Sequence, residues 1–268
     1  MFLWKNTYNN FILNGMEKLN LTTMYTKKLC LLALLFVSAC ATPKYFRKLD
    51  KEEKKAVKTA KQWVDVSPKQ THVLIMTSKG DLVVKLYDET PLHRDNFISK
   101  VKAGFYDSLL FHRVINRFMI QGGDPESKYA TADKRIGSGS APGDRIPAEF
   151  RTEQNIFHKR GALAAARTDN PEKASSNCQF YIVQRPVWRK SELDSTIRSR
   201  NLTLNDYQKN LYTTEGGTPH LDGGYTVFGE LVTGFHVLDS IATAPTKSDR
   251  PITDIRMRMF LLNTPKKK

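Results

Sequence analysis

The sequence predicts a mainly β protein, a closed eight-stranded antiparallel barrel capped by two α-helices, with a helical insertion. Eight short runs, two of them β-rich and the others apolar, are bounded by turn-forming residues. Only two helical patterns frame these runs, and helices do not alternate with strands as they do around a parallel sheet. A composition of 40% apolar and 26% charged residues is sufficient for a hydrophobic core.

The first half of the barrel follows from turn and cap signals. Val73–Thr77 and Asp81–Tyr87 are β-rich runs separated by Ser-Lys-Gly, which predicts a hairpin. Thr90-Pro91 provides an N-cap and a first-turn proline for a helix that runs to about Lys102. The next two strands are expected at Phe111–Val114 and Arg117–Gln121.

The second half contains four more strands, a second helix and an interruption. Gly234–Ile241 has helical spacing. Residues 186–217 are polar and helix-prone, with Leu202, Tyr207 and Leu211 spaced like one helix face, and we interpret them as an insertion between two strands. The remaining strands are expected at Gly161–Ala166, Gln179–Gln184, Thr226–Val232 and Ile252–Leu262.

The positive charge lies mainly outside the predicted barrel. The chain has 42 basic and 27 acidic residues, a formal charge of +15. Eight of the basic residues lie in residues 44–61, whereas residues 71–264 contain 26 basic and 22 acidic side chains. Because basic residues interleaved with aromatic residues do not cluster in the barrel, we expect no nucleic-acid partner.

The N-terminal region has the pattern of an export signal. Lys27-Lys28 is followed by about ten apolar residues, too few for the roughly 20 that span a bilayer. Val37-Ser38-Ala39-Cys40 then resembles the lipobox of bacterial lipoproteins. The resemblance implies cleavage before Cys40 and lipidation of its thiol, which would anchor the chain in the cell envelope, on the periplasmic side. The alternative is an ordinary signal peptide of a soluble exported protein.

These observations predict three regions. Residues 1–39 form the signal region, with Met24 as the expected true start. Residues 40–70 comprise the lipidated cysteine and a lysine-rich tether with a weakly amphipathic helix. Residues 71–264 form the folded domain, including the insertion at 186–217. After signal cleavage Cys178 has no intramolecular disulfide partner, and we expect it to be buried.

The usual signatures of metal and nucleophilic chemistry are missing from the sequence. Its six histidines have no metal-ligand spacing, and GxSxG does not occur. The glycine-rich residues 137–143 lack the lysine of a phosphate-binding loop. We therefore expect no metal and no cofactor, and any enzymatic reaction should need neither.

Four ordered blocks carry a resemblance to one family. Residues 111–115 with 117–124 (FHRVI, RFMIQGGD) resemble the signature of cyclophilin-type peptidyl-prolyl isomerases. Three matching blocks follow at 161–167, 176–182 and 221–229, so the resemblance covers about residues 71–262 without the insertion. It implies the eight-stranded barrel expected above. It also implies isomerisation of X-Pro bonds, which needs loss of amide conjugation and no covalent step.

The resemblance also assigns the site. Arg113 would donate a hydrogen bond to the prolyl nitrogen of the twisted amide, and Gln121 would hold the substrate backbone. Phe118, Met119 and Tyr181 would line an apolar proline pocket; without the resemblance, we would interpret them as core residues. The remaining expected substrate-binding residues are Ala166, Arg167, Gln179, His220, Leu221 and Tyr225.

Three positions depart from the family pattern. Tyr181 replaces the usual phenylalanine, and its added hydroxyl needs a partner. His220 replaces the tryptophan that favours cyclosporin in eukaryotic members, and Tyr225 replaces a histidine. The last two changes weaken the expectation of cyclosporin binding and leave the proposed catalytic arginine in place.

Three functions are compatible with the sequence. The first is a monomeric, membrane-anchored isomerase that acts on proline-containing exported polypeptides and accelerates their folding. The second is a peptide-docking module that uses the same groove with little turnover. The third is an envelope scaffold that contacts anionic lipid through residues 41–70. The presence of both Arg113 and Gln121 favours the first.

Overall fold

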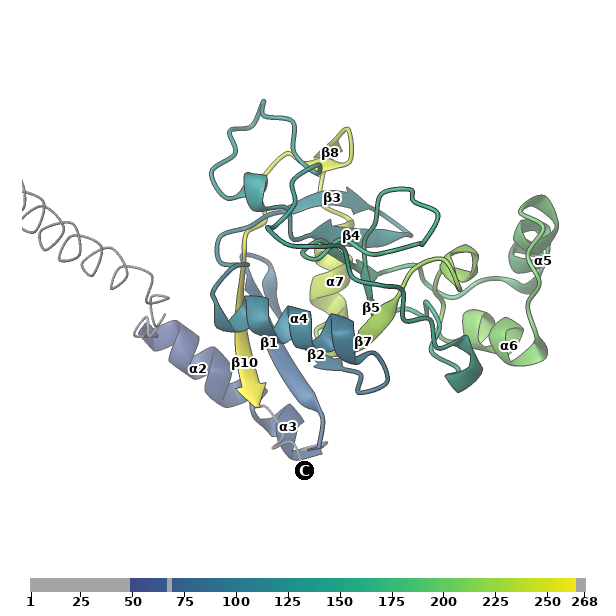
Figure 1. The fold of residues 1–268 in the computed structure, drawn as a ribbon, viewed down its shortest axis with the longest axis horizontal. Helices are drawn as coiled ribbons and strands as arrows, with labels where there is room; N and C mark the ends of the chain where they lie inside the picture. Colours follow the sequence, from purple (N-terminus) through teal and green to yellow (C-terminus); the bar gives the residue numbers. More distant parts are fainter. Residues whose placement is uncertain (1–48, 67–68, 264–268) are drawn as a thin grey trace, which may run out of the picture. The chain divides into compact units, whose positions relative to one another are not determined.

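The structure, a computed structural model, describes residues 49–66 and 69–263 (Figure 1). The signal region, Cys40 and the first part of the predicted tether lie outside these residues. Eight antiparallel strands form one curled sheet. The strands are β1 (Thr71–Thr77), β2 (Gly80–Leu86), β3 (Phe111–Ile115), β4 (Met119–Gly122), β5 (Ala162–Ala165), β6 (Phe180–Val183), β7 (Val227–Thr233) and β10 (Met257–Asn263).

The predicted barrel is open between two of its strands. The strand order is β10-β1-β2-β7-β5-β6-β4-β3, so β10 and β3 form the two edges. Between them the described residues form one isolated bridge, Leu110 to Arg256, and scattered backbone hydrogen bonds such as Phe111 N to Ile255 O at 2.9 Å. The prediction of full closure is therefore wrong.

The reason lies in residues 252–256, which were expected to begin the last strand. They follow a hairpin of two short strands, β8 (Thr246–Lys247) and β9 (Arg250–Pro251), and begin with a bend at residues 252 and 253. Pro251 has no N–H to donate, and the regular strand begins only at Met257. The ladder between the edge strands is consequently interrupted.

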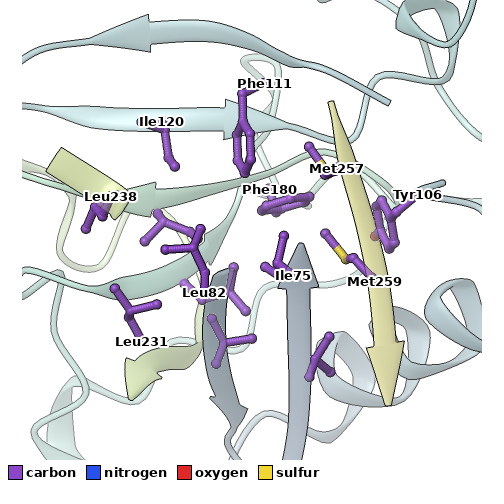
Figure 2. Close-up of a cluster of buried hydrophobic side chains, with 14 of the residues drawn as sticks. Ile75, Leu82, Tyr106, Phe111, Ile120, Phe180, Leu231, Leu238, Met257 and Met259 are labelled. Carbon is purple, nitrogen blue, oxygen red and sulfur yellow. The ribbon is translucent and has the colours of Figure 1, made fainter. Parts of the chain in front are cut away.

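The main core lies between the curled sheet and two helices, α4 (Pro91–Lys102) and α7 (Phe235–Ala242). The two-residue period of β2 directs Leu82, Val84 and Leu86 into this core, while Val83 lies on the other face. Figure 2 shows apolar side chains of several strands converging there, among them Ile75, Leu82, Phe180 and Met259. The two capping helices were predicted correctly.

Part of the predicted tether belongs to the folded body. Helices α2 (Lys51–Ala60) and α3 (Gln62–Val66) cover the outer face of β1 and β10, where Ala60 packs with Leu74, Val83 and Leu262. Asp50 caps α2 in a capping box, and Glu53 forms an ion pair with Arg258 on β10. Residues 50–64 are thus fixed to the sheet by apolar and ionic contacts.

The insertion forms two helices, α5 (Lys190–Ser199) and α6 (Asp206–Thr214), which lie together beside the sheet in Figure 1. Leu193, Leu211, Tyr212 and Phe157 form their small core. The single helix face expected for Leu202, Tyr207 and Leu211 is wrong, because Asn201 adopts a left-handed conformation and Leu202 lies between the helices. Short 3-10 helices occupy Pro125–Ser127 (η2), Thr152–Gln154 (η3) and Pro219–Leu221 (η4).

None of the helices in the described ranges is long and apolar enough to cross a membrane.

Candidate active site

Side chains from separate parts of the sheet line an open pocket of about 220 Å³. They come from β3, from β4 and the turn before it, from β6, and from the ends of β5 and η4. Nine of the eleven predicted catalytic and substrate-binding residues line this pocket: Arg113, Phe118, Met119, Gln121, Ala166, Arg167, Tyr181, Leu221 and Tyr225.

Strand register brings the central residues together. In the β3–β4 hairpin Arg113 pairs with Gln121, and in the β4–β6 ladder Gln121 pairs with Tyr181. Met119 lies two residues before Gln121 and so shares its face of the strand, while Ile120 between them enters the main core. The alternation therefore separates a pocket face from a core face.

The guanidinium of Arg113 stands at the edge of the pocket, with 44% of its side chain exposed. Its Nη1 lies 3.5 Å from Gln121 Oε1, and its Nε lies 3.4 Å from Asp249 Oδ2. Asp249 was not predicted from the sequence. Both contacts are long, so the N–H groups of Arg113 remain available to a ligand in the pocket.

Gln179 lies behind Gln121 and does not line the pocket. Gln121 donates to Gln179 Oε1 at 3.0 Å, and Gln179 donates to the carbonyl groups of Gly137 and Gly139. These bonds orient both amide groups. Gln179 lines a neighbouring cavity of about 170 Å³ beside the glycine-rich loop at 137–143.

The apolar wall is formed by buried rings and a thioether. Met119 and Tyr181 are buried, and Phe118 stacks on His220 with ring centroids 5.7 Å apart and planes 23° apart. His220 thus supports Phe118 and does not itself line the pocket. Burial lowers the pKa of His220 to about 4, so its imidazole is neutral at pH 7.

The extra hydroxyl of Tyr181 is directed away from the pocket. It lies 3.0 Å from Nε2 of His158, whose Nδ1 lies 3.0 Å from Asp222 Oδ1. Sequence reasoning missed His158 and Asp222, although the replacement of phenylalanine by tyrosine signalled that a polar partner must exist. Because the hydroxyl has this partner, the surface facing the pocket remains apolar.

Tyr225 and Arg167 form another part of the pocket rim. The ring of Tyr225 meets that of Tyr181 edge-on, at 6.0 Å and 81°, and the Arg167 guanidinium lies 4.8 Å from the Tyr225 centroid. Arg167 Nε also donates to Gly224 O at 2.9 Å, which fixes the positive charge at the rim.

Within residues 49–66 and 69–263, no group of three or more His, Cys, Asp or Glu side chains is placed to hold a metal ion. The described geometry is that of a concave pocket with an apolar wall and with guanidinium and amide groups at its rim. Such a pocket suits a small apolar ring attached to a polar backbone.

Comparison with known sequences gives a consistent result. The family model described as "Cyclophilin type peptidyl-prolyl cis-trans isomerase/CLD" matches residues 72–260. A putative peptidyl-prolyl cis-trans isomerase of Staphylococcus haemolyticus is 35% identical over 193 residues, covering 71% of this chain and 90% of that protein. One of Staphylococcus aureus strain COL is 36% identical over 196 residues, covering 71% and 91%.

A putative bifunctional phosphatase/peptidyl-prolyl cis-trans isomerase of Streptococcus pyogenes is 38% identical over 189 residues. The match covers 68% of this chain and only 37% of that longer protein.

Solved structures show the same fold. A cyclophilin-type peptidyl-prolyl cis-trans isomerase of Cryptosporidium parvum aligns with a TM-score of 0.54 at 25% identity, covering 73% of this chain and 99% of that one. Its structure in the presence of the dipeptide Ala-Pro aligns with a TM-score of 0.52, again at 25% identity, covering 71% and 98%.

Proposed function

This chain belongs to the cyclophilin-type peptidyl-prolyl cis-trans isomerase family, and we propose that its 220 Å³ pocket binds the proline ring of an X-Pro substrate. Met119, Tyr181 and Phe118 enclose the ring, and Leu221 completes the wall. The observation that carries the proposal is the position of Arg113, whose guanidinium lines the same pocket as these apolar side chains.

Isomerisation requires the amide to lose its conjugation. The uncatalysed barrier is about 18–20 kcal/mol, and it reflects the partial double bond between carbonyl carbon and nitrogen. In the twisted state the prolyl nitrogen regains a lone pair, which accepts an N–H from Arg113. Since that acceptor exists only in the twisted state, the hydrogen bond stabilises the transition state more than either planar form.

Gln121 holds the substrate backbone beside the reacting bond. Its amide group is fixed by the 3.0 Å hydrogen bond to Gln179, so little conformational freedom is lost when substrate binds. No nucleophile and no proton transfer are required.

Isomerase activity of the full chain tests this proposal. A protease-coupled assay with an Ala-Pro peptide should show turnover by the wild type. Arg113→Ala should lower kcat/KM about 30- to 1000-fold, corresponding to roughly 2–4 kcal/mol for one charge-assisted hydrogen bond in a partly desolvated site. Arg198→Ala, which removes an exposed arginine of α5, is the control and should leave the rate unchanged.

If folded Arg113→Ala isomerises as fast as the wild type, the proposed mechanism is wrong. The docking-module function would then be favoured.

We further propose that the protein is exported and anchored by a lipid at Cys40, and that it accelerates the folding of exported polypeptides. Support comes from Lys27-Lys28, the apolar run that follows and the lipobox-like residues 37–40. Exposed lysines of α2 begin eleven residues after Cys40, where they would meet anionic headgroups: Lys51, Lys54, Lys55 and Lys58.

Palmitate labelling in a bacterial host tests the anchor. The wild type and Cys178→Ala, which alters the buried cysteine, should incorporate label and fractionate with membranes. Cys40→Ala should do neither. A wild-type protein that is unlabelled and freely soluble would contradict the anchor.

A further inference from the structure

A buried chain of polar side chains connects the proline pocket with the helical insertion. It begins at Tyr181, whose hydroxyl lies 3.0 Å from His158 Nε2, and continues from His158 Nδ1 to Asp222 Oδ1 at 3.0 Å. The other oxygen of Asp222 accepts two hydrogen bonds from helix α6 of the insertion. The Tyr212 hydroxyl donates at 2.5 Å and Gln208 Nε2 donates at 3.0 Å.

The donors and acceptors along this chain follow from chemistry. Asp222 Oδ1 also accepts the backbone N–H of His158 at 3.0 Å. A carboxylate only accepts, so Nδ1 of His158 donates to Oδ1 of Asp222, and Nε2 faces the Tyr181 hydroxyl. Burial raises the pKa of Tyr181, so its hydroxyl stays protonated and is able to donate to Nε2.

Every member of the chain is shielded from water. The side chain of His158 is 1% exposed and that of Asp222 is 8% exposed, and Tyr212 is fully buried. A buried polar network whose groups all have partners holds its side chains in one arrangement, because each alternative rotamer would leave a polar atom unpaired. Tyr181 is therefore fixed from behind, through its hydroxyl.

The insertion is connected to the pocket indirectly, through this network. None of residues 186–217 lines the pocket. Nevertheless Tyr212 and Gln208 bind Asp222, which directly follows the pocket residue Leu221 in the chain.

We propose, on the basis of the function proposed above, that the insertion is a positioning element of the proline pocket. Tyr212 and Gln208 hold Asp222, Asp222 orients His158, and His158 fixes the ring of Tyr181 against the substrate proline. The substrate class is unchanged, and the insertion determines how tightly the ring is held.

Removing one hydroxyl tests the proposal. In the full chain, Tyr212→Phe keeps the aromatic ring in its small core and deletes only the donor to Asp222. KM for an X-Pro peptide should rise about 3- to 10-fold, the range expected for one hydrogen bond, while kcat changes by less than about twofold. KM changes more than kcat because the wall contacts the proline ring in the planar and twisted states alike.

The matched control is Tyr207→Phe. Tyr207 lies on the same helix, half-exposed, and its ring contacts that of Phe157. This variant should keep the wild-type KM. In a Tyr181→Phe background the hydrogen bond to His158 is already lost, so adding Tyr212→Phe should change KM by less than about twofold.

Two further measurements separate positioning from simple attachment of the insertion. Nitrogen-15 NMR should show the Nδ1-protonated form of His158 in the wild type and a changed Nε2 signal in Tyr181→Phe. Titration with a proline-containing peptide should show the affinity loss of Tyr212→Phe whether or not the wild type turns over substrate. Absent turnover together with this affinity loss would overturn the proposed function and would leave the positioning role standing. A folded Tyr212→Phe with a lower Tm but unchanged KM and peptide affinity would overturn the positioning role.

Discussion

The guanidinium of Arg113 lies between two acceptors, Gln121 on β4 and Asp249 in the turn between β8 and β9. Gln121 Oε1 lies 3.5 Å from Nη1, and Asp249 Oδ2 lies 3.4 Å from Nε. These contacts orient a planar group with several donors, which a lysine ammonium on a flexible stem cannot reproduce.

We therefore expect Arg113→Lys to recover little of the activity lost in Arg113→Ala. Its kcat/KM should stay at least about tenfold below the wild-type value, because the ammonium lacks the fixed donor geometry. The measurement is the same coupled assay at several substrate concentrations. Wild-type activity in Arg113→Lys would show that positive charge alone suffices.

Substitution of Met119 should affect KM more than kcat, in contrast to substitution of Arg113. Its side chain is buried against Ala164, Val183 and Tyr181 and forms part of the pocket wall. Met119→Ala should raise KM roughly 3- to 30-fold with a smaller effect on kcat, since apolar contact with the ring is lost in all states of the substrate.

Met119→Ala should also lower stability by about 2–5 kcal/mol, so circular dichroism must confirm its fold. Met76→Ala, on the outer face of β1, is a control for methionine loss away from the pocket. An unchanged KM in folded Met119→Ala would exclude this residue from the proline site.

At the level of single residues, a sequence resemblance predicts the side chains that meet in the pocket better than it predicts their partners. Arg113 and Gln121 lie in a continuous motif whose hairpin register follows from strand alternation. The hydroxyl of Tyr181 indicated that a polar partner must exist. That partner, His158, and the Asp222 that binds His158 lie 23 and 41 positions away, and only folding brings them together. Such contacts leave no local pattern in the sequence.

The start of helix α4 shows that the sequence also predicts the position of an element better than the contacts that stabilise it. Thr90-Pro91 correctly predicts where the helix begins, yet the Thr90 side chain makes no capping hydrogen bond. Instead the carboxylate of Glu149 accepts the N–H groups of Leu92 and His93 at 3.1 and 3.0 Å. Local signals determined the position of the helix, and a residue 57 positions away satisfies its free N–H groups.

Gly217, the last residue of the insertion, allows a prediction about how the insertion is attached to the sheet. Gly217 has φ +123°, and a Cβ at this position would approach His158 O to 2.2 Å. Gly217→Ala should therefore destabilise the protein by about 2–4 kcal/mol and loosen the insertion, since both conformation and space require glycine. Denaturant unfolding measures the loss.

Gly223→Ala is the matched control. Gly223 has φ +65° with no heavy atom within 4 Å of a Cβ, so only the backbone conformation opposes alanine and about 1 kcal/mol should be lost. Equal losses in the two variants would show that the close approach to His158 does not contribute.

For the described body of the chain, charge and burial explain different properties. The excess of basic residues lies mostly before residue 62, partly on exposed positions of α2, as the sequence predicted. The sequence did not predict that four of its six histidines have a lowered pKa, because burial depends on the complete packing. They are His72, His93, His112 and His220.

These buried histidines predict a loss of stability in mild acid. Burial lowers the pKa of His112 to about 4, from the usual 6.5, and its side chain is only 4% exposed. Above pH 6.5 the imidazole is neutral in both the folded and unfolded chain, and stability is fully present. Between pH 6.5 and about 4 the unfolded chain binds protons that the folded chain does not, so the free energy of unfolding falls as the pH falls.

For His112 alone this difference amounts to about 3 kcal/mol by pH 4. His112→Gln removes the titrating group, so its free energy of unfolding should fall less between pH 7 and pH 4 than that of the wild type, by about that amount. His236→Gln, at an exposed position of α7, is the matched control for the substitution. Urea unfolding at half-unit pH steps measures all three slopes. Because each variant is compared with itself at pH 7, a uniform loss of stability from the substitution cancels, and coincident slopes for wild type and His112→Gln would contradict the assignment of this acid sensitivity to His112.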